Sequence, residues 1–266
     1  MLELEFAELT DVGRVRDHNE DFMGHALPAG EAEGRSHGWL FIVADGVGGE
    51  ELGEVASQTA VETLIAGFRA APRGEAHTVL MPRLVQSANT KIYEMGKASS
   101  PGGSRMATTV VACALRYDRV VVAHVGDSRC YLIRHGLASQ ITRDHTVVAE
   151  QVRLGILSER EASEASTRHL LSRSLGNDLF VNVEITDHHV QPDDVLLLCS
   201  DGLHGPVKGS DIAEIVAWNK DLRIAAQKLI ALANDRDGGD NVSVQLIRVR
   251  GVERMGMYRG RPYKLR

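Results

Sequence analysis

Cysteine is scarce in this chain of 266 residues, which contains only Cys113, Cys130 and Cys199. Their odd number and the lack of a C-x-x-C spacing argue against a disulfide framework and against a zinc site. No apolar run approaches the roughly 20 residues of a membrane-spanning helix. The N-terminus alternates apolar and acidic residues, which is unlike a signal peptide. We therefore expect buried, reduced thiols in a cytoplasmic protein.

An excess of basic residues is also absent, because 36 acidic residues face 30 basic ones and the net charge is −6. Nucleic acid and anionic membranes are therefore not expected as partners. Residues 251–266 depart from this balance, since they carry five basic residues and one acidic residue. This segment has no clear periodicity, so we expect a basic, solvated tail after one large domain over residues 1–250.

Strand patterns dominate the chain, and helical patterns come in pairs. Residues 2–9 and the apolar run 38–44 predict strands, and the glycines and charges of residues 28–38 predict a loop. Amphipathic spacing then predicts one helix from residue 50 and a second helix from Pro82. We expect these two helices to cover one face of a sheet.

Short connections decide the direction of the strands. The apolar segments 108–115, 119–126 and 129–134 are joined by turns of a few residues, whereas a parallel crossover needs about a dozen or more. A polar, mostly helical excursion is expected over 144–176. Further strands are predicted at 181–190, 195–200 and 241–249, with helices at about 210–217 and 222–234. The pattern indicates an α+β layered sandwich of antiparallel sheets.

Four aspartates occupy the same kind of position, at the end of an apolar strand: Asp45, Asp127, Asp201 and Asp240. If these strand ends converge, the carboxylates would repel one another unless cations lie between them. An all-oxygen set of ligands favours Mg²⁺ or Mn²⁺ over Zn²⁺. Gly46 would let its main-chain carbonyl approach such an ion. A single Asp-Gly pair is more often a turn, so the prediction depends on all four ends meeting.

The first 21 residues add an acidic cluster and a candidate site for an anion. Glu20 and Asp21 could anchor metal-bound waters, while Arg14 and Arg16 alternate along an extended segment and would approach the same acidic rim. An arginine beside a metal cluster suits bidentate binding of a phosphate. Surface ion pairs explain these two arginines equally well when the stretch is taken alone.

The order of eight motifs resembles that of the metal-dependent serine/threonine protein phosphatases of the protein phosphatase 2C (PPM) family, and is most similar to the compact bacterial members. The motifs are "TDVGRVRDHNED", "VADGVGGEELGEVAS", "MATTVV", "VGDSRCY", "TRDHT", "SRSLG", "LLLCSDGL" and "GGDNVSV", over about residues 5–250. The resemblance implies a four-layer α/β/β/α sandwich of two antiparallel sheets flanked by paired helices. It also implies two Mn²⁺ or Mg²⁺ ions at one edge.

The resemblance assigns the metal ligands by position. Asp45 would bridge both ions, and the Gly46 carbonyl and Glu20, through water, would complete one of them. Asp201 and Asp240 would hold the other ion.

Supporting roles follow in the same way. Asp127 with Asp201 would suit a third, weaker ion, and Arg16 would grip the substrate phosphate. Asn241 and Asp21 would support the ligands from behind.

The activity that the resemblance implies is hydrolysis of phosphoserine and phosphothreonine in proteins by a metal-bridged hydroxide. The partners would be phosphorylated proteins and a bacterial Ser/Thr kinase that the enzyme opposes. Segment 144–176 would be the flap beside the site. The chain departs from the family at Val47, where animal members have a histidine proposed to protonate the leaving oxygen, and at Ala107, where glycine is usual.

Two other functions remain open from the residues alone. One is a phosphoprotein-binding module without turnover, although all four metal carboxylates are present. The other is a metal phosphatase for nucleotides or other small molecules. Three histidines near the motifs, His124, His145 and His204, are expected to be structural.

Overall fold

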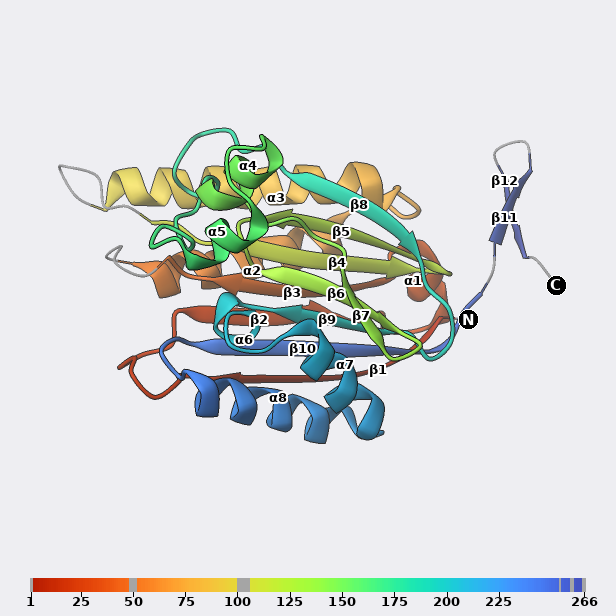
Figure 1. The fold of residues 1–266 in the computed structure, drawn as a ribbon. Coiled ribbons are helices and arrows are strands. Elements are labelled where there is room, and N and C mark those ends of the chain that lie inside the picture. The colour runs from red at the N-terminus through yellow and green to blue at the C-terminus, as the bar shows by residue number, and fades with distance from the viewer. Residues whose placement is uncertain (1, 48–51, 100–105, 254, 259–260, 265–266) are drawn as a thin grey trace.

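The computed structural model describes residues 2–47, 52–99, 106–253, 255–258 and 261–264. Two five-stranded antiparallel sheets face each other, and helices cover their outer faces (Figure 1). The predicted α/β/β/α sandwich is therefore confirmed.

One sheet has the strand order β2-β3-β4-β5-β8. Its strands are β2 (Asp21–Ala26), β3 (Trp39–Asp45), β4 (Val110–Arg116), β5 (Arg119–Val125) and β8 (Glu184–His189). Helices α2 (Gly53–Ala70) and α3 (His77–Ala98) pack on its outer face, where Leu64, Phe68 and Ile92 are buried. Figure 1 shows α3 along the upper side of the molecule.

The other sheet has the order β1-β10-β9-β6-β7. Its strands are β1 (Glu3–Asp11), β10 (Val242–Gly251), β9 (Val195–Cys199), β6 (Arg129–Arg134) and β7 (Leu137–Gln140). Helices α6 (Asp201–His204), α7 (Gly209–Trp218) and α8 (Leu222–Arg236) cover its outer face, with α8 along the lower side in Figure 1.

The alternation of side chains along β3 explains why this strand is apolar throughout. Leu40 and Ile42 face helices α2 and α3, whereas Phe41 and Val43 face the opposite sheet. Each buried leucine or phenylalanine stabilises the fold by roughly 1.5–3 kcal/mol. Cys113 and Cys130 belong to the layer between the sheets, and all three cysteines are free and buried, as the sequence predicts.

Two predicted elements are wrong in part. The expected loop over 28–38 contains a short helix, α1 (Glu31–Ser36), with a Glu31–Arg35 ion pair of 3.8 Å between successive turns. Helix α3 begins at His77 rather than Pro82, so the proline lies inside the helix. Proline has no N–H, so the carbonyl of Thr78, four residues earlier, lacks its usual helical hydrogen bond. Thr78 is exposed, so water can donate a hydrogen bond to this carbonyl instead.

The C-terminal segment is also more regular than expected. Strands β11 (Met255–Tyr258) and β12 (Arg261–Lys264) form a separate antiparallel hairpin. Arg254, Arg259 and Arg266 of the predicted basic tail lie outside the described residues, as does residue 50, the expected start of α2. None of the described helices is long and apolar enough to cross a bilayer.

The excursion between β7 and β8 carries helices α4 (Val147–Arg153) and α5 (Glu159–Glu164). Helix α5 begins with a capping box, in which Ser158 accepts a hydrogen bond from the Glu161 N–H and Glu161 accepts from the Ser158 N–H. We call residues 144–176 the flap.

Candidate metal centre

Both sheets deliver aspartates to one edge of the sandwich. Asp21 at the start of β2 lies opposite Asp45 at the end of β3. Asp201 lies two residues after the end of β9, and Asp240 lies two residues before the start of the paired strand β10. Asp127 lies in the crossover between β5 and β6, which belong to different sheets. The structure thus brings these aspartates together at one edge of the sandwich. We call the site formed by Asp21, Asp45, Asp127, Asp201 and Asp240 the mouth.

The electrostatics of this mouth show how closely the carboxylates crowd. Burial, followed by the charges of Asp21, Asp201, Asp127 and Asp240, raises the pKa of Asp45 well above its usual value. Burial and the charge of Asp201 raise the pKa of Asp127 to about 7, and burial and Asp240 raise the pKa of Asp201. Concentrated negative charge of this kind favours a divalent cation.

Asp21 carries the clearest sign of a missing partner. Its Oδ2 accepts a hydrogen bond of 2.7 Å from Ser200 Oγ, whose oxygen in turn accepts from the Ser243 N–H at 2.9 Å. Its Oδ1 is buried and has no hydrogen-bond partner among the described residues. Burial raises the pKa of Asp21 to about 7. A buried oxygen of this kind calls for a water or an ion.

Glycine makes room for the predicted carbonyl ligand. The Gly46 N–H donates to the Glu20 carbonyl at 3.1 Å, and a Cβ at Gly46 would lie 2.6 Å from the Gly53 carbonyl oxygen. A Cβ at Gly53 would in turn lie 3.2 Å from the Glu20 carboxylate. The glycines after β3 therefore let Glu20 and the first turn of α2 pack closely against Gly46.

Asn241 fixes the segment that carries Glu20. Its Oδ1 accepts from the Glu20 N–H at 2.8 Å, and its Nδ2 donates to the carbonyls of Val12 and His18 at 2.9 and 3.0 Å. Asn241 thereby ties the acidic cluster of the N-terminal segment to the residue next to Asp240.

Arg16 reaches the mouth, whereas Arg14 binds elsewhere. Arg16 holds Asp240 with a fork, Nε to Oδ1 at 2.9 Å and Nη2 to Oδ2 at 3.0 Å, and both side chains are about 40% exposed. Arg14 instead pairs with Asp235 on α8 at 2.5 Å. The expectation that both arginines face the same rim is therefore wrong for Arg14.

The carboxylates predicted as ligands do not form a compact single-ion site. Within the described part of the chain, ligand atoms of three residues lie within 4.8 Å of one another in two sets only, His18–Glu20–Glu54 and His124–His145–Glu184. A pair of ions about 3.5–4 Å apart would spread its ligands more widely than that. Of the predicted ligands, Glu20 belongs to one of these two sets.

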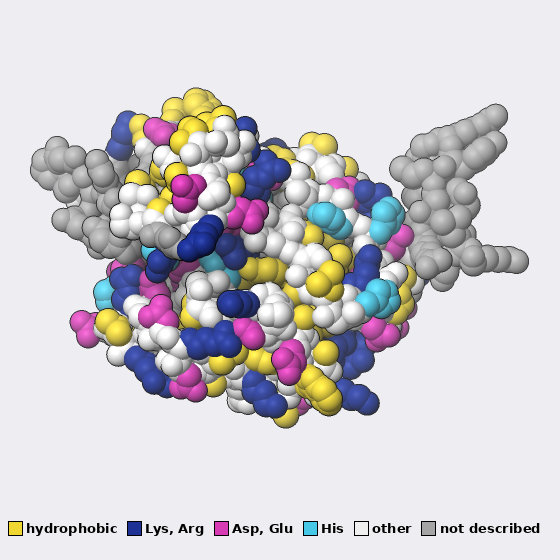
Figure 2. Space-filling model, viewed as in Figure 1, with side chains coloured by type: hydrophobic (Ala, Val, Ile, Leu, Met, Phe, Trp, Pro, Cys, Tyr) yellow, Lys and Arg dark blue, Asp and Glu magenta, His cyan; other side chains and the backbone are white. Residues whose placement is uncertain are grey.

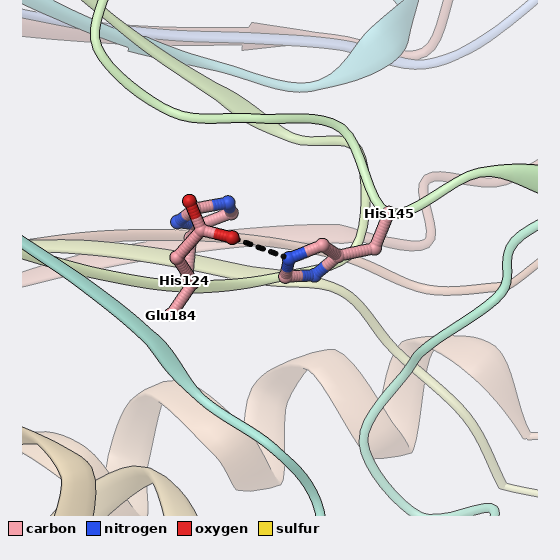
Figure 3. Close-up of side chains that lie close together, drawn as sticks. All are labelled: His124, His145 and Glu184. Carbon is pink, nitrogen blue, oxygen red and sulfur yellow. Dashed lines mark hydrogen bonds and ion pairs between the residues drawn. The ribbon is translucent and has the colours of Figure 1, made fainter. Parts of the chain in front are cut away.

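Figure 3 shows the set His124–His145–Glu184, in which His145 contacts Glu184 and His124 Nδ1 is buried without a hydrogen-bond partner among the described residues. His145 Nδ1 accepts from the Gly126 N–H at 3.2 Å, so the proton of the neutral ring lies on Nε2, which faces Glu184 at 3.3 Å. His124 Nε2 contacts the Arg143 carbonyl at 2.8 Å, and the two rings stack at 4.7 Å. We assign the set a structural role at the base of the flap, as expected for both histidines.

A groove of about 1080 Å³ runs between the flap and the ends of α6 and α8, and Asp127 lines its inner end. Figure 2 shows the hollow beneath the flap. His169 of the flap also lines it, with Nδ1 at 3.9 Å from Asp201 Oδ2. The groove therefore borders the mouth at Asp127, and His169 connects its lining to Asp201.

Several supporting side chains escaped the sequence analysis. Thr109 Oγ1 accepts from the Asp45 N–H at 3.1 Å, and Thr108 Oγ1 donates to the Asp45 carbonyl at 2.8 Å. Arg129 grips Asp144 with a fork of 2.9 and 2.6 Å. Their signal was present, because these residues lie within the motifs "MATTVV", "VGDSRCY" and "TRDHT", but their partners are distant in sequence.

The protein-family model described as "Protein phosphatase 2C" matches residues 17–229 of this chain. The chain belongs to the protein phosphatase 2C family. A serine/threonine phosphatase of Listeria innocua is 36% identical over 255 residues, which cover 95% of this chain and 96% of the relative. Protein phosphatase PhpP of Streptococcus pneumoniae is 31% identical over 92% of this chain and 97% of its own length.

Solved structures of this family have the same fold. The serine/threonine phosphatase of S. agalactiae superposes with a TM-score of 0.85 at 34% identity, covering 93% of this chain and all of that one. The catalytic domain of the phosphatase PstP, solved in complex with two manganese ions, gives a TM-score of 0.79 at 33% identity and covers 94% of this chain. The match in fold thus covers more than nine-tenths of this chain.

Proposed function

We propose that this chain hydrolyses phosphoserine and phosphothreonine in proteins with the help of two Mn²⁺ or Mg²⁺ ions. The observation that most supports this function is the group of buried carboxylates at the mouth, whose pKa values are raised by burial and then by one another's charges. Membership of the protein phosphatase 2C family supports the same chemistry.

The ligands that we propose are those that the family resemblance implies. Asp45 would be shared by both ions, with the Gly46 carbonyl and, through water, Glu20 on one side and Asp201 and Asp240 on the other. When bound, the ions would lower the pKa of a water molecule and offset charge on the phosphoryl group.

Further residues would support this set. Asp127 with Asp201 would hold a weaker third ion. Asp21 would act from behind the ligands, as its unpartnered Oδ1 suggests.

The remaining side chains would bind and orient the substrate. The planar guanidinium of Arg16, already at the mouth, suits two oxygens of a phosphate. Val47 is held by a 3.0 Å hydrogen bond from its N–H to the Ala107 carbonyl, and its apolar side chain has no proton to give. A water from the open groove would therefore protonate the leaving oxygen.

The biological setting is part of the proposal. Phosphoserine and phosphothreonine are made by protein kinases, so a bacterial-type Ser/Thr kinase is expected to act on the same substrates. The three cysteines are unpaired thiols, which supports a reducing, cytoplasmic location.

A substrate series tests the function. The metal-free protein should hydrolyse phosphoserine and phosphothreonine peptides only after Mn²⁺ or Mg²⁺ is added, and chelation should abolish turnover. Phosphotyrosine peptides and nucleotides should be poorer substrates at matched concentrations. Faster hydrolysis of nucleotides, or turnover unaffected by chelation, would overturn the proposal.

A further inference from the structure

The crossover that carries Asp127 is short and joins the two sheets. Only Gly126, Asp127 and Ser128 lie between β5 and β6, which belong to different sheets. The position of the Asp127 carboxylate is therefore set by how these three residues are held.

The crossover is anchored first to the sheet of Asp45. Ser128 Oγ lies 2.7 Å from Thr109 Oγ1, and the same Thr109 oxygen accepts from the Asp45 N–H at 3.1 Å. This chain of hydrogen bonds connects Asp127 to the side of the mouth that carries Asp45, but not to Asp201.

The anchor toward Asp201 comes from His204. Helix α6 is a single turn that begins at Asp201 and ends at His204, and His204 Nε2 lies 3.0 Å from the Asp127 carbonyl oxygen. Because a carbonyl only accepts, Nε2 carries the proton and donates it.

We propose that His204 is a positioning residue for the third metal ion, which we call the outer ion. His204 holds the main chain of Asp127 against the helix that begins with Asp201, and we call this contact the clamp. The inference rests on the proposed function, in which Asp127 and Asp201 hold a third ion. One helical turn thus carries a carboxylate at one end and the clamp for its partner at the other. Without the clamp, the crossover keeps its bonds to Thr109 and His145, and the next residue, Arg129, keeps its pairing with Cys199 of β9. The Asp127 carbonyl, however, loses its direct tie to α6, so the separation of the two carboxylates is less closely fixed.

Outer partners that orient metal ligands typically contribute about 10–100-fold in affinity. His204 acts through the main chain of the ligand, so we expect an effect of about tenfold, at the low end of that range. The effect should be confined to the outer ion, because Asp45 and Asp240 do not depend on the clamp.

Mn²⁺ titration of the metal-free protein by calorimetry measures this effect directly. His204→Leu keeps an apolar side chain of similar bulk but removes the donor, and His204→Gln restores an N–H donor at similar reach. We expect His204→Leu to weaken the outer site about tenfold and leave the inner ions unchanged, and His204→Gln to stay near the wild type. In an Asp127→Ala background, His204→Leu should change nothing further.

The outcomes separate this inference from the proposed function. Unchanged outer-ion affinity in His204→Leu, equal weakening of all ions, or failure of His204→Gln to rescue would each overturn the role of His204. A wild-type protein that hydrolyses phosphopeptides but binds only two ions would overturn it too, with the proposed function intact. A wild-type protein that binds no ion would overturn both. If His204→Leu does not fold, His204→Asn, whose shorter amide cannot reach the carbonyl, replaces it.

Discussion

The two ends of strand β9 carry aspartates with opposite environments. At one end, Asp194 is 1% exposed and accepts from Arg134 Nε and Nη2 at 2.8 and 2.7 Å and from the Gln191 N–H at 2.8 Å. At the other end, Asp201 faces other carboxylates, and its nearest ion-pair contact is His169 at 3.9 Å. We call the Asp194 end, where the ion pair is complete, the closed end. We call the Asp201 end, where the carboxylate needs added positive charge, the open end.

This difference separates a structural carboxylate from a candidate ligand. Both aspartates border the same apolar strand, so burial alone does not distinguish them. The distinguishing feature is the partner, because an arginine fork satisfies Asp194 whereas the charge of Asp240 raises the pKa of Asp201 after burial. Changes at the two ends should therefore give opposite phenotypes.

The largest expected effect is on catalysis at the open end. Asp201→Asn removes a proposed metal ligand and should lower Mn²⁺-dependent hydrolysis of a phosphopeptide by about 10³-fold, or ~4 kcal/mol in the transition state. Steady-state kinetics under saturating Mn²⁺ measure the loss. Asp194→Asn, the matched change at the closed end, should keep kcat within about twofold. Retained activity in Asp201→Asn would contradict the ligand assignment.

Next in size is the response of the metal-free protein to pH. Asp21 and Asp127 have pKa values raised to about 7 in the folded state, against an ordinary value of 3.8. Between these values the folded protein binds more protons than the unfolded chain, so its free energy of unfolding falls as the pH rises from about 4 to about 7. We expect a loss of several kcal/mol, since a pKa difference of one contributes about 1.4 kcal/mol for each group.

Excess Mn²⁺ should reverse this trend, since it favours the ionised carboxylates. Urea unfolding across this pH range, with chelator and with Mn²⁺, provides the measurement. If the stability of the metal-free protein instead rises with pH, the carboxylates at the mouth do not destabilise the fold when they ionise.

A smaller effect is expected on stability at the closed end. Asp194→Asn weakens the fork with Arg134, which is only partly buried, and should lower the free energy of unfolding by about 2 kcal/mol at pH 7. Mn²⁺ should not restore this loss. The comparison of the two ends breaks down if Asp194→Asn instead changes the affinity for Mn²⁺.

The sequence predicts the open end better than the closed one. Asp45, Asp127, Asp201 and Asp240 stand out because each lies near the end of an apolar run and beside a glycine, a pattern visible in a few neighbouring residues. Asp194 gives no such signal, because its partner Arg134 is sixty residues away and meets it only through the pairing of β6 with β9. Local periodicity likewise predicts the strands and layers, but not the hairpin after residue 254 or the start of α3.

The smallest effect should come from replacing the cation that reaches the open end. Arg16→Lys keeps the charge but loses the planar fork, so we expect KM for a phosphopeptide to rise about tenfold with little change in kcat. Its pair with Asp240 is exposed, so stability should change by less than about 1 kcal/mol. Arg14→Lys, whose side chain pairs with Asp235, is the matched control and should leave KM unchanged. Equal effects of the two changes would mean that a general positive potential, rather than the fork of Arg16, attracts the phosphate to the mouth.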